Sequence, residues 1–206
     1  MALKIYGVAR SRAFRTLWMA KELGLDYEHV KVDFATGATR TPAHLALNPN
    51  GQVPVIDDNG FVLWESMAIN LYLAKKYGVG TLYPTRLEDE ARAWQWSFWG
   101  MTEVERPVLT ALFNRTILPE DKLDAAAADD AEKQLAQPLR VLDGAFGRDA
   151  NLLGDNFTVA DLNVASILAW ARPAQIDMSP FPKVAVWLKN CAERPAARAA
   201  RQLQRE

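Results

Sequence analysis

Cysteine and histidine are scarce in this chain. Among its 206 residues there is one cysteine, Cys191, and there are two histidines, His29 and His44. A single cysteine cannot form an internal disulfide, so we expect a cytosolic protein. The two histidines are too few and too poorly placed for a metal site, and we expect both at the surface or in loops. Cys191 lies in a helical pattern, where we expect a small buried apolar residue.

An excess of charge and long apolar runs are also absent. The chain has 24 Lys and Arg against 25 Asp and Glu, which gives a formal net charge of −1. It therefore lacks the basic excess typical of proteins that bind nucleic acid. No apolar run reaches the roughly 18 residues of a membrane-spanning helix, and the N-terminus does not resemble a signal peptide. We expect neither a nucleic-acid partner nor a membrane partner.

The residue pattern changes near residues 78–85. Before this point strands and helices alternate, and after it the pattern is helical throughout. A βαβ unit followed by a hairpin and a helix predicts a thioredoxin-like domain, so the fold class is α/β followed by all-α. We expect domains at 1–79 and 87–206, with a linker at 80–86. The expected elements are strand 3–6, helix 11–23, strand near 27–33, hairpin 53–63, helix 66–77 and helical segments 87–113, 124–146, 158–172 and 181–191.

The segment 48–56, Asn-Pro-Asn-Gly-Gln-Val-Pro-Val-Ile, indicates a peptide-binding edge. Pro54 has no N–H, so the main chain before it is not fully used by a neighbouring strand and is left for a peptide ligand. Ser66 then begins a helix, whose free N–H groups and positive dipole end attract a carboxylate. Taken singly, each feature also fits an ordinary trans strand start and an ordinary helix cap.

The combination is more specific. The motif N-P-x-G-x-[VI]-P, followed by a hairpin and the pair Glu65-Ser66, resembles the glutathione-binding half of the cytosolic glutathione S-transferases. The resemblance is to serine-type, phi- or theta-like members. It implies the fold of that family, with a thioredoxin-like N-terminal domain and an all-helical C-terminal domain. It also implies a homodimeric detoxification enzyme that uses glutathione as co-substrate and needs no metal.

The resemblance also implies a role for each motif residue. Val53 would pair through its N–H and C=O with the cysteinyl part of glutathione, and Pro54 would be cis. Glu65 would bind the α-amino group of the γ-glutamyl end, and Ser66 its α-carboxylate. Both assignments match charge with opposite charge or with a helix N-terminus.

Two further polar residues fit the same peptide. Gln52 would make an additional contact with glutathione. Arg40 stands twelve positions earlier, where plant-type relatives have a basic residue, and would bind the glycine carboxylate. Arg40 fits equally well as a solvated loop charge.

Ser11 is the candidate that activates the thiol. It lies between the first strand and the first helix, at or next to the N-cap, with its hydroxyl free to point at a ligand. A hydroxyl donor and a helix N-terminus would lower the thiol pKa from its usual value of about 8.5. Ser11 precedes Arg15 by four residues, as in theta- and delta-like transferases. A plain cap at Ser11 remains an alternative, and so does Tyr6, because alpha-, mu- and pi-like enzymes use a tyrosine near this strand end.

The absence of cysteine at this position narrows the chemistry. The segment reads Arg10-Ser11-Arg12-Ala13, so glutaredoxin-like disulfide exchange is disfavoured, and the zeta-like S-S-C pattern is missing. We expect conjugation of glutathione to electrophilic apolar substrates. Glutathione-dependent peroxidase or isomerase activity on the same site stays open, as does a non-catalytic module used for dimerisation.

The helical half contains a cap motif and an aromatic segment. Thr158 and Asp161 form a capping box, with Phe157 as the hydrophobic staple, so we expect Asp161 to be structural.

Trp96 and Trp99 lie three residues apart, hence on one helix face. They would either line an apolar substrate pocket or pack the core and a dimer contact.

Overall fold

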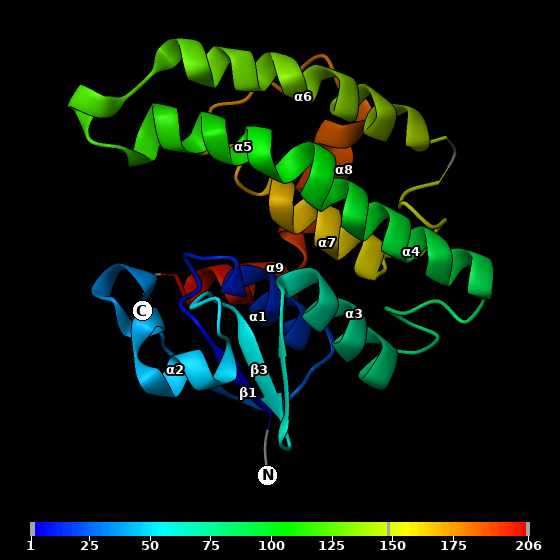
Figure 1. Ribbon diagram of the computed structural model, residues 1–206. Helices are drawn as coiled ribbons and strands as arrows, with labels where there is room; N and C mark the ends of the chain where they lie inside the picture. Colours follow the sequence, from blue (N-terminus) through cyan, green and yellow to red (C-terminus); the bar gives the residue numbers. More distant parts are fainter. Residues whose placement is uncertain (1–2, 148, 205–206) are drawn as a thin grey trace. The chain divides into compact units, whose positions relative to one another are not determined.

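The computed structural model describes residues 3–147 and 149–204. Contacts divide the chain into two compact units, the first made of Met1–Tyr83 with Glu193–Glu206 and the second of Pro84–Ala192 (Figure 1). The first holds a four-stranded sheet with helices, and the second is helical. The predicted thioredoxin-like half followed by an all-helical half is confirmed.

The sheet of the first unit has the strand order β2-β1-β3-β4. Its strands are β1 (Leu3–Tyr6), β2 (Tyr27–Val30), β3 (Val55–Asp58) and β4 (Phe61–Trp64). β1 pairs in parallel with β2, so the chain crosses between them through helix α1 (Ala13–Glu22), whereas β3 and β4 form an antiparallel hairpin. Ile5 lies opposite His29 and Ile56 and is fully buried, which places the centre of this core on β1.

Helices α3 (Ser66–Tyr77) and α9 (Pro195–Gln202) both pack against α1. Every α1 residue from Ala13 to Ala20 is buried as a result. Arg194 donates to both carboxylate oxygens of Glu22, at 2.6 and 2.8 Å, and so ties the start of α9 to the end of α1. Such a bidentate pair fixes geometry as well as adding energy.

Several elements differ from the sequence-based expectation; strand β2, for example, ends at Val30 and not near residue 33. Helix α1 begins at Ala13 rather than at residue 11. Helix α2 (Pro42–Leu47), preceded by the short turns η1 (Phe34–Thr36) and η2 (Ala38–Arg40), was not predicted, although Thr41 caps it and Pro42 opens it. Helix α9 was not predicted either, and it packs within the first unit instead of extending the domain 87–206. Its buried Ala197 and Ala200 are too small to give a strong apolar pattern.

The second unit contains one long helical run and a buried central helix. The run comprises α4 (Leu87–Trp99), the π-helical η3 (Gly100–Val104), α5 (Glu105–Leu112) and the π-helical η4 (Phe113–Ile117). It is followed by η5 (Glu120–Lys122), α6 (Ala125–Ala145), α7 (Val159–Leu168) and α8 (Pro182–Glu193). All ten α7 residues are buried, because α4, η3 and α5 pack against this helix.

The predicted capping box begins α7. As expected, the Thr158 side chain accepts from backbone N–H groups in the first turn of α7, and the Asp161 side chain accepts from the Thr158 N–H. The Asp161 carboxylate also accepts from the Leu152 N–H at 2.8 Å and from the Trp187 indole at 3.0 Å. Burial raises the pKa of the Asp161 carboxyl, and these hydrogen bonds oppose that rise. Asp161 is therefore an internal anchor that joins three segments of the unit.

The aromatic side chains of α4 fall into two groups, one half-buried and one exposed. The rings of Trp96 and Trp99 meet edge to face with centroids 5.0 Å apart, and both are half-buried. Trp94 and Phe98 are exposed, Phe98 by 62%. None of the described helices is long and apolar enough to cross a membrane.

Candidate active site

Gly7 is the point at which three parts of the first unit meet. It follows β1 with a φ of +130°, and a Cβ placed on it would lie 2.8 Å from the Ala13 Cβ and 2.9 Å from the Val53 Cβ. The start of α1 and the segment before β3 therefore approach the same backbone position. A glycine is required here both by the left-handed φ and by the close approach. This meeting point brings Ser11 and Val53, predicted from separate motifs, into one neighbourhood.

Ser11 lies just outside α1, and its hydroxyl is engaged. Its Oγ donates to the Val8 carbonyl at 2.7 Å and accepts from the Ala13 N–H at 3.1 Å. The N-cap position itself is Arg12, which makes no side-chain cap bond. We expected a hydroxyl free to point at a ligand; the expectation is wrong in this respect, because serine bonds readily to nearby backbone in such a turn. Donation to a ligand requires the hydroxyl to leave Val8.

The loop that carries Ser11 is held from β2 and from the turn after it. His29, half-buried on β2, donates through Nε2 to the Gly7 carbonyl at 2.7 Å. Arg10 pairs with Asp33 and lies over the Phe34 ring. The hydrogen bond from Arg10 lowers the pKa of the Asp33 carboxyl. The loop position is thus fixed by groups that the motif analysis did not single out.

The main chain at Val53 is open. The Val53–Pro54 peptide bond is cis, which is the isomer that the resemblance implies. The ladder between β1 and β3 ends at the pair Tyr6 and Val55, so Val53 lies beyond it. Among residues 3–147 and 149–204, neither the N–H nor the C=O of Val53 has a backbone partner. Both groups are available to an extended peptide.

Glu65 and Ser66 lie at the beginning of α3. Glu65 occupies the N-cap position with φ 73° and ψ 113°, a conformation that residues other than glycine seldom adopt. Ser66 is the first helical residue and is buried, and its Oγ accepts a hydrogen bond from Arg15 Nη1 at 3.2 Å. Because a guanidinium can only donate, the Ser66 hydroxyl keeps its own hydrogen for an acceptor.

Arg40 lies beside the turn that leads to Val53. Its Nη1 donates to the Asn50 carbonyl at 3.3 Å, and a Cβ on Gly51 would lie 2.6 Å from the same nitrogen. Arg40 and the Gln52 side chain are both exposed. They are therefore near each other in space and accessible, as residues that bind the exposed end of a ligand have to be.

Both histidines were expected at the surface or in loops, but His29 is half-buried on β2, and His44 departs further from the expectation. We expected it at the surface or in a loop, but it lies in α2 with only 4% of its surface exposed. Its Nε2 is 3.0 Å from the Gln52 carbonyl, which also accepts from Asn48 Nδ2 at 2.9 Å. The signal that could have found it is its place in a short helix capped by Thr41, directly before the Gln52 motif.

Tyr6, the rival to Ser11, is held in the β1 ladder opposite Val30 and Val55. Cys191 is buried as predicted. No group of three or more potential metal ligands gathers anywhere in the described part of the chain.

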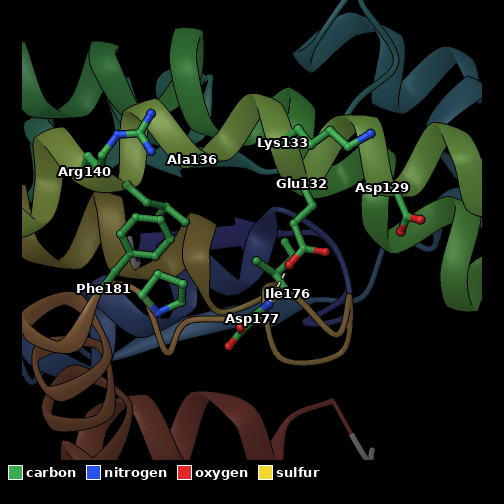
Figure 2. Close-up of a pocket in the computed structure, with 10 residues that line it drawn as sticks. Asp129, Glu132, Lys133, Ala136, Arg140, Ile176, Asp177 and Phe181 are labelled. Carbon is green, nitrogen blue, oxygen red and sulfur yellow. Dashed lines mark hydrogen bonds between the residues drawn. The ribbon is translucent and has the colours of Figure 1, made fainter.

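The second unit has a hollow of its own. It measures about 550 Å³ and lies between α6 and the segment that precedes α8. Figure 2 shows Arg140 at one end and Asp129 at the other, with Phe181 and Ile176 between them. No residue predicted to bind glutathione lines it, since all of those belong to the first unit.

Comparison with known proteins identifies the family. The model of the glutathione S-transferase N-terminal domain matches residues 1–75, and that of the C-terminal domain matches residues 105–195. The chain is 37% identical to glutathione S-transferase 3 of Zea mays, over 94% of this chain and 90% of the maize protein.

Two solved structures are similar over nearly the full length. The theta class glutathione S-transferase of the citrus canker pathogen Xanthomonas axonopodis pv. citri, with glutathione bound, gives a TM-score of 0.90 at 31% identity and covers 97% of this chain and 96% of that one. Glutathione S-transferase I from maize, in complex with an atrazine glutathione conjugate, gives 0.88 at 30% identity, over 100% and 99%. The chain therefore belongs to the cytosolic glutathione S-transferase family and is a glutathione transferase.

Proposed function

We propose that glutathione binds along the open main chain of Val53 as one added antiparallel strand. The observation that carries this proposal is the Val53 backbone, which precedes a cis proline and has no main-chain partner in the described chain. Its N–H and C=O would pair with the cysteinyl residue. The Xanthomonas relative is a structure with glutathione bound, which supports a peptide of this kind as the ligand.

The two ends of glutathione would be held by side chains on either side of Val53. Ser66 would donate its hydroxyl hydrogen to the γ-glutamyl α-carboxylate, and the nearby Arg15 guanidinium adds positive charge at the α3 N-terminus. Glu65 would accept from the α-amino group. Arg40 and Gln52 would bind the glycine end, where both side chains are exposed.

Ser11 would stabilise the thiolate of the bound glutathione. Its hydroxyl would stop donating to the Val8 carbonyl and would donate to the sulfur instead. This change favours the thiolate, because a hydrogen bond to an ion is stronger than one to a neutral carbonyl. The proton of the thiol is released to solvent, and Ser11 stays an alcohol throughout. The thiolate is then the nucleophile that attacks an electrophilic apolar substrate.

The finer assignments are proposals of the same kind. The maize relative in complex with an atrazine glutathione conjugate supports conjugation of an apolar electrophile. The exposed Trp94 and Phe98 on α4 support a homodimer, because large exposed aromatic side chains often mark an interface. The cytosolic location rests on the single cysteine of the sequence.

The experiment is thiolate difference absorbance with and without glutathione, for the wild type, Ser11→Ala and Tyr6→Phe. We expect the thiolate signal in the wild type and in Tyr6→Phe, and its loss in Ser11→Ala with glutathione affinity nearly intact. An unchanged thiolate signal in Ser11→Ala, with loss in Tyr6→Phe, would transfer the role to Tyr6. Turnover of an aromatic halide, compared with an organic hydroperoxide, separates conjugation from peroxidase chemistry.

A further inference from the structure

The Gln52 carbonyl is held by two side chains from the preceding segment. His44 Nε2 lies 3.0 Å from it and Asn48 Nδ2 lies 2.9 Å from it. Because a carbonyl oxygen only accepts, the His44 hydrogen is on Nε2. Both side chains are buried, with 4% of His44 and 2% of Asn48 exposed. The carbonyl of Gln52 is therefore held by two buried donor side chains.

This carbonyl belongs to the same peptide group as the Val53 N–H. The cis peptide bond found here is the next one, Val53–Pro54, so the Gln52–Val53 bond is trans and its C=O and N–H point in opposite directions. Two donors that fix the oxygen consequently fix the direction of the N–H. That N–H has no backbone partner among the described residues.

The two donors also act electrostatically. Hydrogen bonds to a carbonyl polarise its peptide group and make the N–H on the other side a stronger donor. The effect is larger in a buried site, where solvent does not screen it. His44 and Asn48 therefore both orient and strengthen the Val53 N–H, the main-chain donor that would pair with glutathione.

A purely structural role for His44 does not account for two features of its surroundings. One donor would satisfy the Gln52 carbonyl, and Asn48 already supplies it. His44 also leaves its Nδ1 buried without a hydrogen-bond partner within the described residues, which is unfavourable for folding. An apolar side chain at this position in α2 would avoid that cost. Satisfying the Gln52 carbonyl alone therefore does not account for an imidazole at this position.

We propose that His44 is a positioning residue for glutathione, which acts with Asn48 through the Gln52–Val53 peptide. The proposal rests on the proposed binding of glutathione at Val53. His44 touches no reacting atom, so its effect falls on binding of the tripeptide and not on the chemical step.

Two substitutions at one position test this inference. His44→Leu removes the donor and fills the space, whereas His44→Gln keeps an amide N–H near the place of Nε2. The probe is S-methylglutathione, with its Kd measured by calorimetry on the full chain. We expect His44→Leu to raise the Kd and the glutathione KM about tenfold, with kcat at saturating glutathione nearly unchanged. His44→Gln should restore most of the affinity. Equal affinity of His44→Leu and the wild type would overturn the proposal.

A second ligand separates positioning from general loosening of the site. In an analogue of S-methylglutathione whose cysteinyl carbonyl is replaced by a methylene group, nothing accepts from the Val53 N–H. His44→Leu should weaken binding of the natural tripeptide and leave binding of this analogue nearly unchanged. Equal weakening of both ligands would show that His44 does not act through this N–H. The amide nitrogen chemical shift of Val53, measured without ligand, should move in His44→Leu and return toward the wild-type value in His44→Gln.

Asn48→Asp provides an independent variant if His44→Leu does not fold. It keeps the oxygen that accepts from the Asn50 N–H at 3.0 Å and loses the Nδ2 donor. We expect a higher Kd in this variant too, and an unchanged Kd would contradict the proposal. Failure of the wild type itself to bind S-methylglutathione would refute the proposed binding at Val53, a result distinct from failure of the His44 series alone.

Discussion

Arg15 on α1 donates a hydrogen bond to the hydroxyl of Ser66 at the start of α3, across 51 positions of sequence and a distance of 3.2 Å. The Arg15 side chain is fully buried. The contact joins the helix that follows the Ser11 loop to the helix that would bind the γ-glutamyl carboxylate. It also leaves the Ser66 hydrogen directed elsewhere, which is what a ligand carboxylate needs.

Ser66→Ala should therefore raise the glutathione KM by roughly tenfold or more, because a hydrogen bond to a charged group is worth about 1.5–3 kcal/mol. The kcat at saturating glutathione should change little, since the lost contact is made equally in the ground state and the transition state. Steady-state kinetics over a wide glutathione range measure both. Ser179→Ala, which removes an exposed serine of the second unit, is the control. A fall in kcat without a change in KM would exclude this role for Ser66.

Glu65 combines a proposed ligand contact with a strained backbone. At φ 73° a glycine is less strained, because it lacks a Cβ, whereas alanine is as strained as glutamate. Both Glu65→Gly and Glu65→Ala should raise the glutathione KM. Glu65→Gly should nevertheless be more stable than Glu65→Ala, by about 1 kcal/mol, in unfolding by denaturant. If alanine proved the more stable of the two, the left-handed conformation of residue 65 would be in doubt.

The sheet is anchored to α3 by a buried carboxylate that makes stability depend on pH. Asp58 accepts from Lys76 Nζ at 2.6 Å and from the hydroxyls of Tyr72 and Tyr77. Burial raises the pKa of the Asp58 carboxyl, but these three donors outweigh burial and hold the pKa below its ordinary value. A depressed folded-state pKa stabilises the protein above the unfolded-state pKa of about 3.9, and this contribution is lost as pH falls through the folded-state value.

We therefore expect Asp58→Asn to cost about 1–3 kcal/mol of unfolding free energy near neutral pH. The difference between the variant and the wild type should shrink as pH falls below about 4. Denaturant unfolding at a series of pH values measures it. A difference that stays constant down to the most acidic pH tested would mean that the carboxylate charge contributes nothing.

Sequence patterns predicted the fold for two reasons. The spacing of apolar residues changes near residues 78–85 from alternating strands and helices to helices throughout, and the motif at 48–66 predicts the hairpin and α3. They missed α2 and α9, which are short and have few large apolar residues. They placed Asp161 in its capping box but not its contacts with Leu152 and Trp187, which depend on tertiary packing. His44 was misplaced for the same reason: burial of a polar side chain depends on a partner, here the Gln52 carbonyl, that no local pattern reveals.

A substitution at Gly7 tests whether glutathione binding depends on the close approach of Val53 to the backbone after β1. A Cβ at this position would press on Ala13 and Val53 at distances under 3.0 Å, and the φ of +130° would strain the backbone in addition. Gly154→Ala is a matched control, because its φ is +115° and nothing lies within 4 Å of the added Cβ. Both substitutions should cost about 1–3 kcal/mol of unfolding free energy from backbone strain. Only Gly7→Ala has to displace Val53 as well, so it alone should raise the Kd for S-methylglutathione, by about tenfold or more. Calorimetric binding beside denaturant unfolding separates the two effects, and equal Kd values for the two variants would mean that the position of Val53 does not govern binding.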